Sequence, residues 1–169
     1  MIHEVKGDLT TYEADFICHQ ANYHGVMGGG VALAIWNKML DRQARAAYQI
    51  HCAKKGANLL GTVQFVPAVQ HTADGDRMCV VYNLFCQADE VQEDGGITHY
   101  ESMRDCLEQV ERLARRSGRT VALPGYMGCG IAGGNWQRVR GIIEDVFGNS
   151  PVSCTIVYHD VPRRTMKNS

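Results

Sequence analysis

The sequence predicts an α/β fold in which one sheet is covered by helices on both faces, and two observations support this prediction. Apolar runs of strand length alternate with segments whose apolar residues recur at helical spacing along most of the 169 residues. Two glycine-rich segments, residues 25–30 and 125–134, each lie between a predicted strand and a predicted helix. A single domain is expected at this length, large enough to bury a core without disulfide bonds.

Residues 1–56 are expected to contain two strands followed by two helices. Residues 2–6 alternate between apolar and polar side chains, which predicts a half-buried strand, and the apolar run at residues 16–18 predicts a second strand. A helix should begin at Val31, directly after the glycines. The next helix should begin at Asp41, a suitable N-cap, and end at Gly56. Its buried face is formed by Ala44, Ala47, Tyr48 and Cys52.

A hairpin and an acidic loop are expected next. Residues 62–66 and 79–84 have the composition of strands, and Asp74-Gly75-Asp76 between them has turn chemistry, so the two strands can pair through a longer loop. Residues 87–97 then form an acidic loop. Its carboxylates are candidates for a general acid, with a solvated loop as the alternative for each: Asp89, Glu90, Glu93 and Asp94.

The last part of the chain adds two helices and two strands. Thr98-x-x-Glu101 has the form of a capping box, and the helix that it opens should end at Gly118. Residues 120–123 and 153–158 are expected to be strands, and residues 162–169 a polar tail. The helix between these strands has an apolar face made of Trp136, Val139, Ile143 and Val146.

The composition excludes several classes of protein. With 17 basic and 18 acidic residues the net charge is −1, so no field of one sign can attract nucleic acid. The seven cysteines are odd in number and include no C-x-x-C pair, which argues against a disulfide framework and a zinc site. No H-E-x-x-H or calcium-loop spacing occurs, so neither a metal nor another cofactor is expected. Free cysteines, and the lack of a signal peptide or membrane-spanning stretch, favour a soluble cytoplasmic protein.

Both glycine-rich segments have a sequence suited to binding phosphate. A glycine-rich turn before a helix exposes backbone N–H groups at the positive end of the helix dipole, and the missing Cβ atoms let a ligand approach closely. Gly128-x-Gly130-x-x-Gly133 also matches the dinucleotide-binding motif. That motif usually opens its fold, whereas here one helix and one strand follow it. Two such loops at neighbouring strand ends can instead hold a diphosphate from both sides.

Together these segments give the chain a resemblance to the macrodomains, which bind ADP-ribose. The resemblance implies a three-layer α/β/α fold with a central, mixed, mostly parallel six-stranded sheet, a domain at residues 1–161 followed by the tail, and a monomer. Within the family the chain is most similar to the small single-domain branch that contains ADP-ribose-1''-phosphate phosphatases and ADP-ribosyl-glutamate hydrolases. The residues that carry the resemblance are Val5–Leu9, residues 19–32, Leu59-Leu60-Gly61, Gly128-Cys129-Gly130 with Trp136, and Val157-Tyr158.

The resemblance also implies a ligand site. Asp8 would bind the adenine amino group, Tyr158 would lie against the adenine ring, and Asn22 would bind a hydroxyl of the distal ribose. The first glycine segment would wrap the diphosphate and distal ribose, and the second would close over the phosphates. The implied ligand-binding residues are Asp8, Leu9, Asn22, Gly25, Val26, Met27, Gly28, Gly29, Gly30, Val31, Met127, Gly128, Cys129, Gly130, Ile131, Ala132, Gly133 and Tyr158.

Three groups near these loops are candidates for chemistry. His19 matches a position where the phosphatases carry a histidine tied to activity, and a core histidine within the strand is the alternative. Asn22 would act beside it, and His24 is a weaker candidate because a solvated loop residue can explain it. Cys129 is not expected to be a nucleophile, because a cysteine phosphatase needs an arginine six residues later and that position is Asn135.

Three functions remain open at the level of the sequence. The first is a phosphatase that acts on ADP-ribose-1''-phosphate. The second is a hydrolase that removes ADP-ribose from modified proteins, although the lysine and aspartate that the glutamate hydrolases use are replaced by Gln87 and Ala132. The third is a non-catalytic reader of ADP-ribose. The partner is therefore ADP-ribose, a derivative of it or an ADP-ribosylated protein, and neither sequence-specific nucleic acid nor a membrane.

Overall fold

The computed structural model describes residues 1–159, so the end of the predicted domain and the predicted tail at residues 162–169 lie outside it. The strands are β1 (Ile2–Lys6), β2 (Phe16–Ala21), β3 (Val63–Thr72), β4 (Gly75–Phe85), β5 (Val121–Pro124) and β6 (Cys154–Tyr158). The helices are α1 (Gly30–Met39), α2 (Arg42–Lys55), the 3₁₀ helix η1 (Gly56–Leu59), α3 (Tyr100–Ser117) and α4 (Trp136–Phe147).

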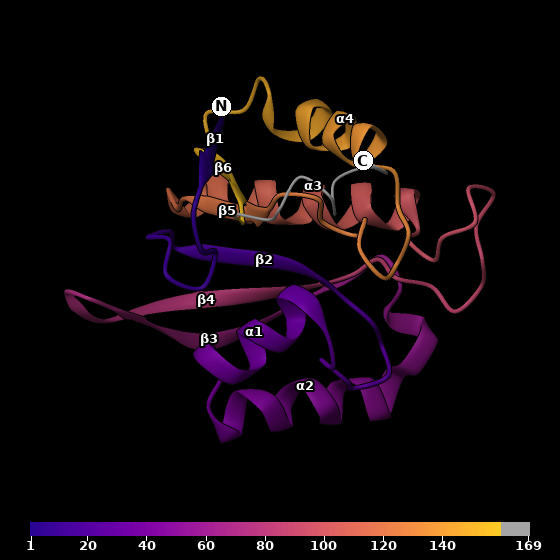
Figure 1. Cartoon of the computed structure of the whole chain (residues 1–169), viewed down its shortest axis with the longest axis horizontal. Coiled ribbons are helices and arrows are strands. Elements are labelled where there is room, and N and C mark those ends of the chain that lie inside the picture. Colours follow the sequence, from indigo (N-terminus) through magenta and orange to yellow (C-terminus); the bar gives the residue numbers. More distant parts are fainter. Residues whose placement is uncertain (160–169) are drawn as a thin grey trace.

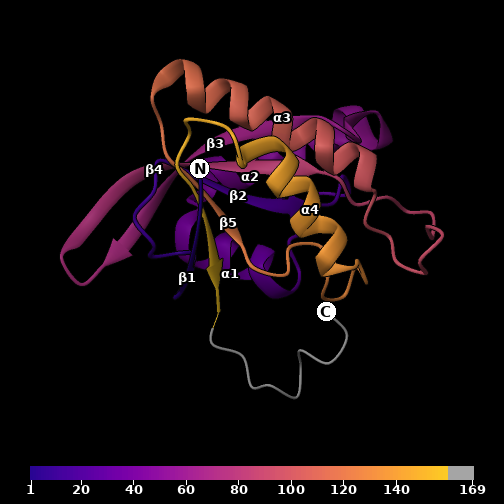
Figure 2. The same ribbon diagram turned by 90° about the horizontal axis from the view of Figure 1, so that it is seen from above.

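These strands form one sheet with helices on both faces. The strand order is β1-β6-β5-β2-β4-β3, and every neighbouring pair is parallel except β3 and β4. Figure 1 shows α1 and α2 on one side of the sheet and α3 and α4 on the other, and Figure 2 shows the same layers from above. The predicted three-layer fold with a mixed, mostly parallel six-stranded sheet is confirmed.

The core lies in two layers, one on each face of the sheet. One apolar cluster joins the sheet to α3 and α4, and the other joins it to α1 and α2. The central strand β2 contributes to both clusters, because Phe16 and Cys18 face the first and Ile17 and Ala21 face the second. Its carboxyl end therefore stands at the middle of one edge of the sheet, held from both sides.

The hairpin is longer than the sequence suggested. The pairing of β3 with β4 is confirmed, but the predicted long loop is wrong, because the antiparallel ladder continues to Thr72 and Gly75. Buried and exposed side chains keep alternating along β3 as far as Thr72, so both strands extend beyond the apolar runs. Pro67 does not interrupt β3, since this is an edge strand.

The helix caps agree with the sequence in one case and correct it in another. The Asp41 carboxylate caps α2 and accepts a hydrogen bond from Ala44 N at 2.8 Å, as predicted. The predicted capping box at Thr98 is wrong, because the N-cap of α3 is His99, whose Nδ1 accepts from Ser102 N at 3.2 Å. The Thr98 hydroxyl instead donates to the Gly128 carbonyl at 2.6 Å. A tertiary partner has replaced the local one.

Candidate functional site

Three loops meet at the carboxyl ends of β5, β2 and β4, which are neighbours in the sheet. The first glycine loop, residues 22–29, leads from β2 to α1. The acidic loop, residues 87–97, follows β4, and the second glycine loop, residues 125–134, leads from β5 to α4. Ligands of open α/β sheets bind at the carboxyl ends of parallel strands, so this edge is the expected place for a site.

The three loops contact one another in pairs and form a closed ring. His24 Nε2 of the first glycine loop lies 2.5 Å from Asp89 Oδ1 of the acidic loop. Ile97 N of the acidic loop donates to Ala132 O of the second glycine loop at 2.8 Å. The two glycine loops meet where Gly29 approaches Ile131, since a Cβ on Gly29 would lie 3.3 Å from Ile131 Cδ1. The structure thus brings together the two segments that the sequence singled out.

The N-terminus of α1 opens onto this ring. Gly29 is its N-cap and provides no side-chain hydrogen bond, and the first bond to its carbonyl comes from Leu33 N at 3.2 Å. The amide groups of the first helical turn are therefore left for another acceptor, at the positive end of the helix dipole. A phosphate is the group that such an end binds most readily.

Asn22 organises the first glycine loop. Its Oδ1 accepts from the His24 amide at 2.9 Å, and its Nδ2 donates to Val26 O at 2.8 Å. The Tyr48 hydroxyl of α2 holds the Asn22 carbonyl at 2.8 Å. Because both ends of the amide bond the loop itself, the structure shows Asn22 shaping the loop. The ribose contact and catalytic role predicted for Asn22 stay predictions.

The structure places His19 inside the molecule. Its side chain lies among core residues with 1% of its surface exposed, and His19 Nε2 is 2.7 Å from Asn83 Oδ1. Asn83 in turn donates to Gln64 Oε1, and Gln64 donates to the Ala47 carbonyl of α2. Burial lowers the pKa of His19 to about 4, against a smaller opposing effect of its hydrogen bonds. This position argues against the predicted role as nucleophile or base, because the ring is almost completely enclosed by the protein.

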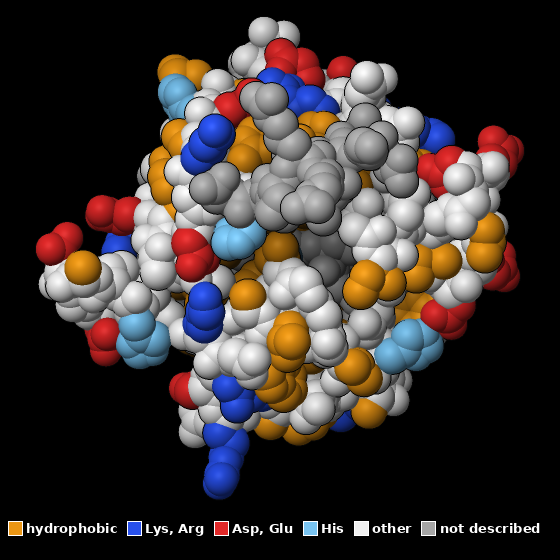
Figure 3. Space-filling view, in the orientation of Figure 1, with side chains coloured by type: hydrophobic (Ala, Val, Ile, Leu, Met, Phe, Trp, Pro, Cys, Tyr) orange, Lys and Arg blue, Asp and Glu red, His pale blue; other side chains and the backbone are white. Residues whose placement is uncertain are grey.

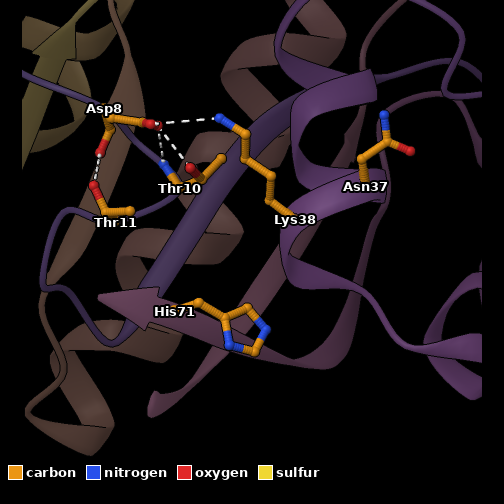
Figure 4. A pocket seen from close by; sticks show the side chains of 6 residues that line it. All are labelled: Asp8, Thr10, Thr11, Asn37, Lys38 and His71. Atoms are coloured by element: carbon orange, nitrogen blue, oxygen red, sulfur yellow. Dashed lines mark hydrogen bonds and ion pairs between the residues drawn. The ribbon is translucent and has the colours of Figure 1, made fainter. Parts of the chain in front are cut away.

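A cavity of about 390 Å³ lies beside Asp8. Figure 4 shows the Asp8 carboxylate directed toward Lys38 of α1 across this cavity. Asp8 Oδ1 accepts from Thr10 N at 2.9 Å and from Thr10 Oγ1 at 2.7 Å, while Oδ2 lies 3.7 Å from Lys38 Nζ. Partial burial raises the pKa of Asp8, but these hydrogen bonds and Lys38 outweigh it and lower the pKa overall. The cavity is lined by Asp8, Thr10, Thr11, Asn37, Lys38 and His71.

Tyr158 stands at the end of β6 in an aromatic group. Its ring centroid is 5.5 Å from that of Tyr126 and 5.9 Å from that of Trp136, both in edge-on contact. Its hydroxyl lies 3.3 Å from Glu4 Oε1, and burial raises the pKa of Tyr158 to about 12. The structure thus fixes the position of Tyr158, and its contact with adenine stays a prediction.

The sequence did not identify a group of polar contacts around Gln20, at the base of the three loops. Gln20, the next residue after His19, donates to Thr98 Oγ1 at 3.1 Å, and Cys86 Sγ lies 3.3 Å from Gln20 Oε1. Gln20 therefore links the end of β2 to the base of the acidic loop. The available signal was a polar side chain next to the predicted end of an apolar strand.

Burial raises the pKa of the Cys129 thiol to about 12, which agrees with the expectation that Cys129 does not act as a nucleophile.

The surface and the metal-binding groups are described for residues 1–159 only. On the face shown in Figure 3, basic and acidic side chains are scattered, and neither kind forms one continuous patch. No three His, Cys, Asp or Glu side chains of the described residues come together where they could hold a metal ion. No helix in this part of the chain is both long and apolar enough to cross a membrane.

A family model described as Macro domain matches residues 18–143. The chain belongs to the macrodomain family. This range includes the first glycine loop, the acidic loop and the second glycine loop, so the family match covers the whole ring. The resemblance inferred from the sequence is confirmed.

Three known proteins illustrate how much of this chain its relatives match. An ADP-ribose 1''-phosphate phosphatase of Candida albicans is 24% identical in an alignment of 155 residues that covers 86% of this chain and 93% of that protein. A macrodomain protein of Streptomyces coelicolor is 29% identical, with a TM-score of 0.70, over 96% of this chain and 100% of that one. Thermosipho africanus DarTG in complex with ADP-ribose has a TM-score of 0.68 at 16% identity, over 94% of this chain and 42% of that one.

Proposed function

We propose that this macrodomain binds ADP-ribose between its two glycine loops and hydrolyses an ADP-ribose derivative, with the phosphomonoester of ADP-ribose-1''-phosphate as the substrate. The observation that carries the proposal is the uncapped N-terminus of α1, which opens onto the ring where Gly29 meets Ile131. A diphosphate there accepts hydrogen bonds from the first helical turn and from amides of the second glycine loop. The match to a phosphatase of similar length supports the choice of substrate.

In this proposal, different residues of the chain bind different parts of ADP-ribose. Asp8 Oδ2, the oxygen that Thr10 leaves free, accepts a hydrogen bond from the adenine amine. The first glycine loop, with Val31, and residues 127–133 surround the diphosphate and the distal ribose. The protein acts as a cytoplasmic monomer and needs no metal, since backbone N–H groups can stabilise the charge on the phosphate oxygens.

Removal of the Asp8 carboxylate is expected to weaken ADP-ribose binding. Asp8→Ala leaves the adenine amine without its acceptor, and the dissociation constant should rise by a factor equivalent to roughly 1–3 kcal/mol. Calorimetry with ADP-ribose measures the change. The inosine analogue of ADP-ribose, which lacks the amine, is the matched control. It should bind wild type more weakly than ADP-ribose does, and its affinity should fall little further in Asp8→Ala. Equal affinity of wild type for both ligands would contradict the adenine contact.

One assay series on the wild-type chain tests the reaction. Phosphate release from ADP-ribose-1''-phosphate is followed beside ADP-ribose release from a glutamate-modified protein, with and without EDTA. We expect phosphate release that persists in EDTA. Release of ADP-ribose from protein without phosphate release would replace the phosphatase with a protein-directed hydrolase. Binding of ADP-ribose without either product would leave a reader, and activity that needs added magnesium would contradict the metal-free mechanism.

A further inference from the structure

The contact between His24 and Asp89 joins two of the three loops of the ring. The residues are 65 positions apart in the sequence, and their strands, β2 and β4, run side by side in parallel register, with Ala21 opposite Phe85. His24 Nε2 lies 2.5 Å from Asp89 Oδ1, and the side chains are 55% and 60% exposed. The similar pair His71–Asp76 joins residues only five apart within the hairpin. The first pair alone places a histidine and a carboxylate at the ring.

The backbone of His24 is held in place although its ring is exposed. The His24 amide donates to Asn22 Oδ1, and the Asn22 amide group holds Val26 O on the other side. The Tyr23 ring lies beside the imidazole, with 4.8 Å between centroids. His24 therefore has a fixed backbone, a neighbouring aromatic ring and a carboxylate partner, immediately before the glycines that lead into α1.

The chemistry of the pair differs from that of His19. The hydrogen bond from His24 lowers the pKa of Asp89, so this carboxylate is ionised near neutral pH and can only accept. The proton of the hydrogen bond therefore belongs to His24 Nε2, and Nδ1 is the ring nitrogen left to accept a proton during the reaction. An imidazole oriented by a carboxylate is a common general base. His19, in contrast, is enclosed in the core.

We propose that His24 is the proton-transfer group of the hydrolysis and that Asp89 is its positioning residue. This inference rests on the proposed function. His24 Nδ1 takes a proton from a water molecule as the water oxygen forms its bond to phosphorus. The bond between phosphorus and the C1'' oxygen breaks, and that oxygen receives the proton returned by the imidazolium through solvent. The products are ADP-ribose and inorganic phosphate, and Asp89 keeps the imidazole oriented without being protonated.

Chemical rescue tests the role of His24. In His24→Ala the rate of phosphate release should fall by about 100-fold or more, while ADP-ribose affinity changes little. Added imidazole should restore part of that rate, because the exposed position leaves room for the free base. Asp89→Asn should lower kcat with little effect on KM, and imidazole should not restore it. The matched controls are His3→Gln on β1 and Asp76→Asn on the hairpin, which should keep the wild-type rate.

The outcomes separate this inference from the proposed function. An active wild type whose His24→Ala variant keeps its rate, or loses it without any rescue by imidazole, overturns the role of His24 and leaves the phosphatase standing. A wild type that binds ADP-ribose but releases no phosphate overturns the proposed reaction, and the role of His24 with it. Partial rescue of His24→Ala, with no rescue of Asp89→Asn, supports both assignments.

Discussion

Replacement of Gly134 by alanine is expected to destabilise the protein and to weaken ADP-ribose binding together. A Cβ at this position would lie 2.5 Å from the Gly128 carbonyl oxygen and 3.3 Å from Thr98 Cβ. The same carbonyl accepts hydrogen bonds from Gly134 N at 2.8 Å and from Thr98 Oγ1 at 2.6 Å. The added methyl group must therefore push the second glycine loop away from the carbonyl that anchors it.

Two measurements follow from this displacement. The free energy of unfolding in urea should fall by about 1–3 kcal/mol, as for other overpacked sites. The dissociation constant for ADP-ribose should rise by about tenfold, because the displaced loop loses amide contacts to the phosphates.

Gly141→Ala is the matched control. Nothing lies within 4 Å of its added Cβ, and it sits in the exposed face of α4, so it should stabilise the chain by about 0.5–1 kcal/mol. Unchanged stability and affinity in Gly134→Ala would mean that the loop does not anchor on Gly128.

The elements of the fold could be predicted because their signals are local. The apolar periodicities and the cap at Asp41 involve residues a few positions apart, and the structure confirms the cap and the helices that they predict. One residue of the predicted buried face of α2, Ala47, is exposed. The error at Thr98 has a tertiary cause. Nothing near Thr98 in the sequence shows that the Gly128 carbonyl lies within reach of its hydroxyl. The Thr98 hydroxyl therefore makes a tertiary hydrogen bond in place of the local capping bond that the sequence predicts.

The candidate site could be predicted in its segments but not in its chemistry. The two glycine segments were identified from their composition, and the structure brings them into contact at Gly29 and Ile131. His19 is buried because helices cover both faces of the central strand β2, and the sequence, which does not show this, leaves both of its roles open. The sequence offers His24 as a weaker catalytic candidate and Asp89 as one of four possible acids in the acidic loop, and nothing in it connects the two. Only the pairing of β2 with β4 shows that these two meet.

The buried His19 should make the protein sensitive to mild acid. Its pKa is about 4 in the folded state and about 6.5 when the chain is unfolded, because burial disfavours the charged ring. As the pH falls, the unfolded state takes up the proton first. The contribution of His19 to stability is therefore complete above pH 6.5 and is lost between pH 6.5 and pH 4. The loss should reach about 2 kcal/mol by pH 5 and about 3 kcal/mol by pH 4.

His19→Gln isolates this contribution. The glutamine amide does not titrate in this range, and it keeps an N–H donor for Asn83 Oδ1. Urea unfolding of wild type and variant at pH 7 and pH 5 measures the two changes in stability. The carboxylates and the other histidines affect both proteins equally, so wild type should lose about 2 kcal/mol more than the variant over this interval. If both lose the same amount, then His19 is either protonated in the folded state or open to solvent. In that case, its exclusion from the chemistry of the site would have to be withdrawn.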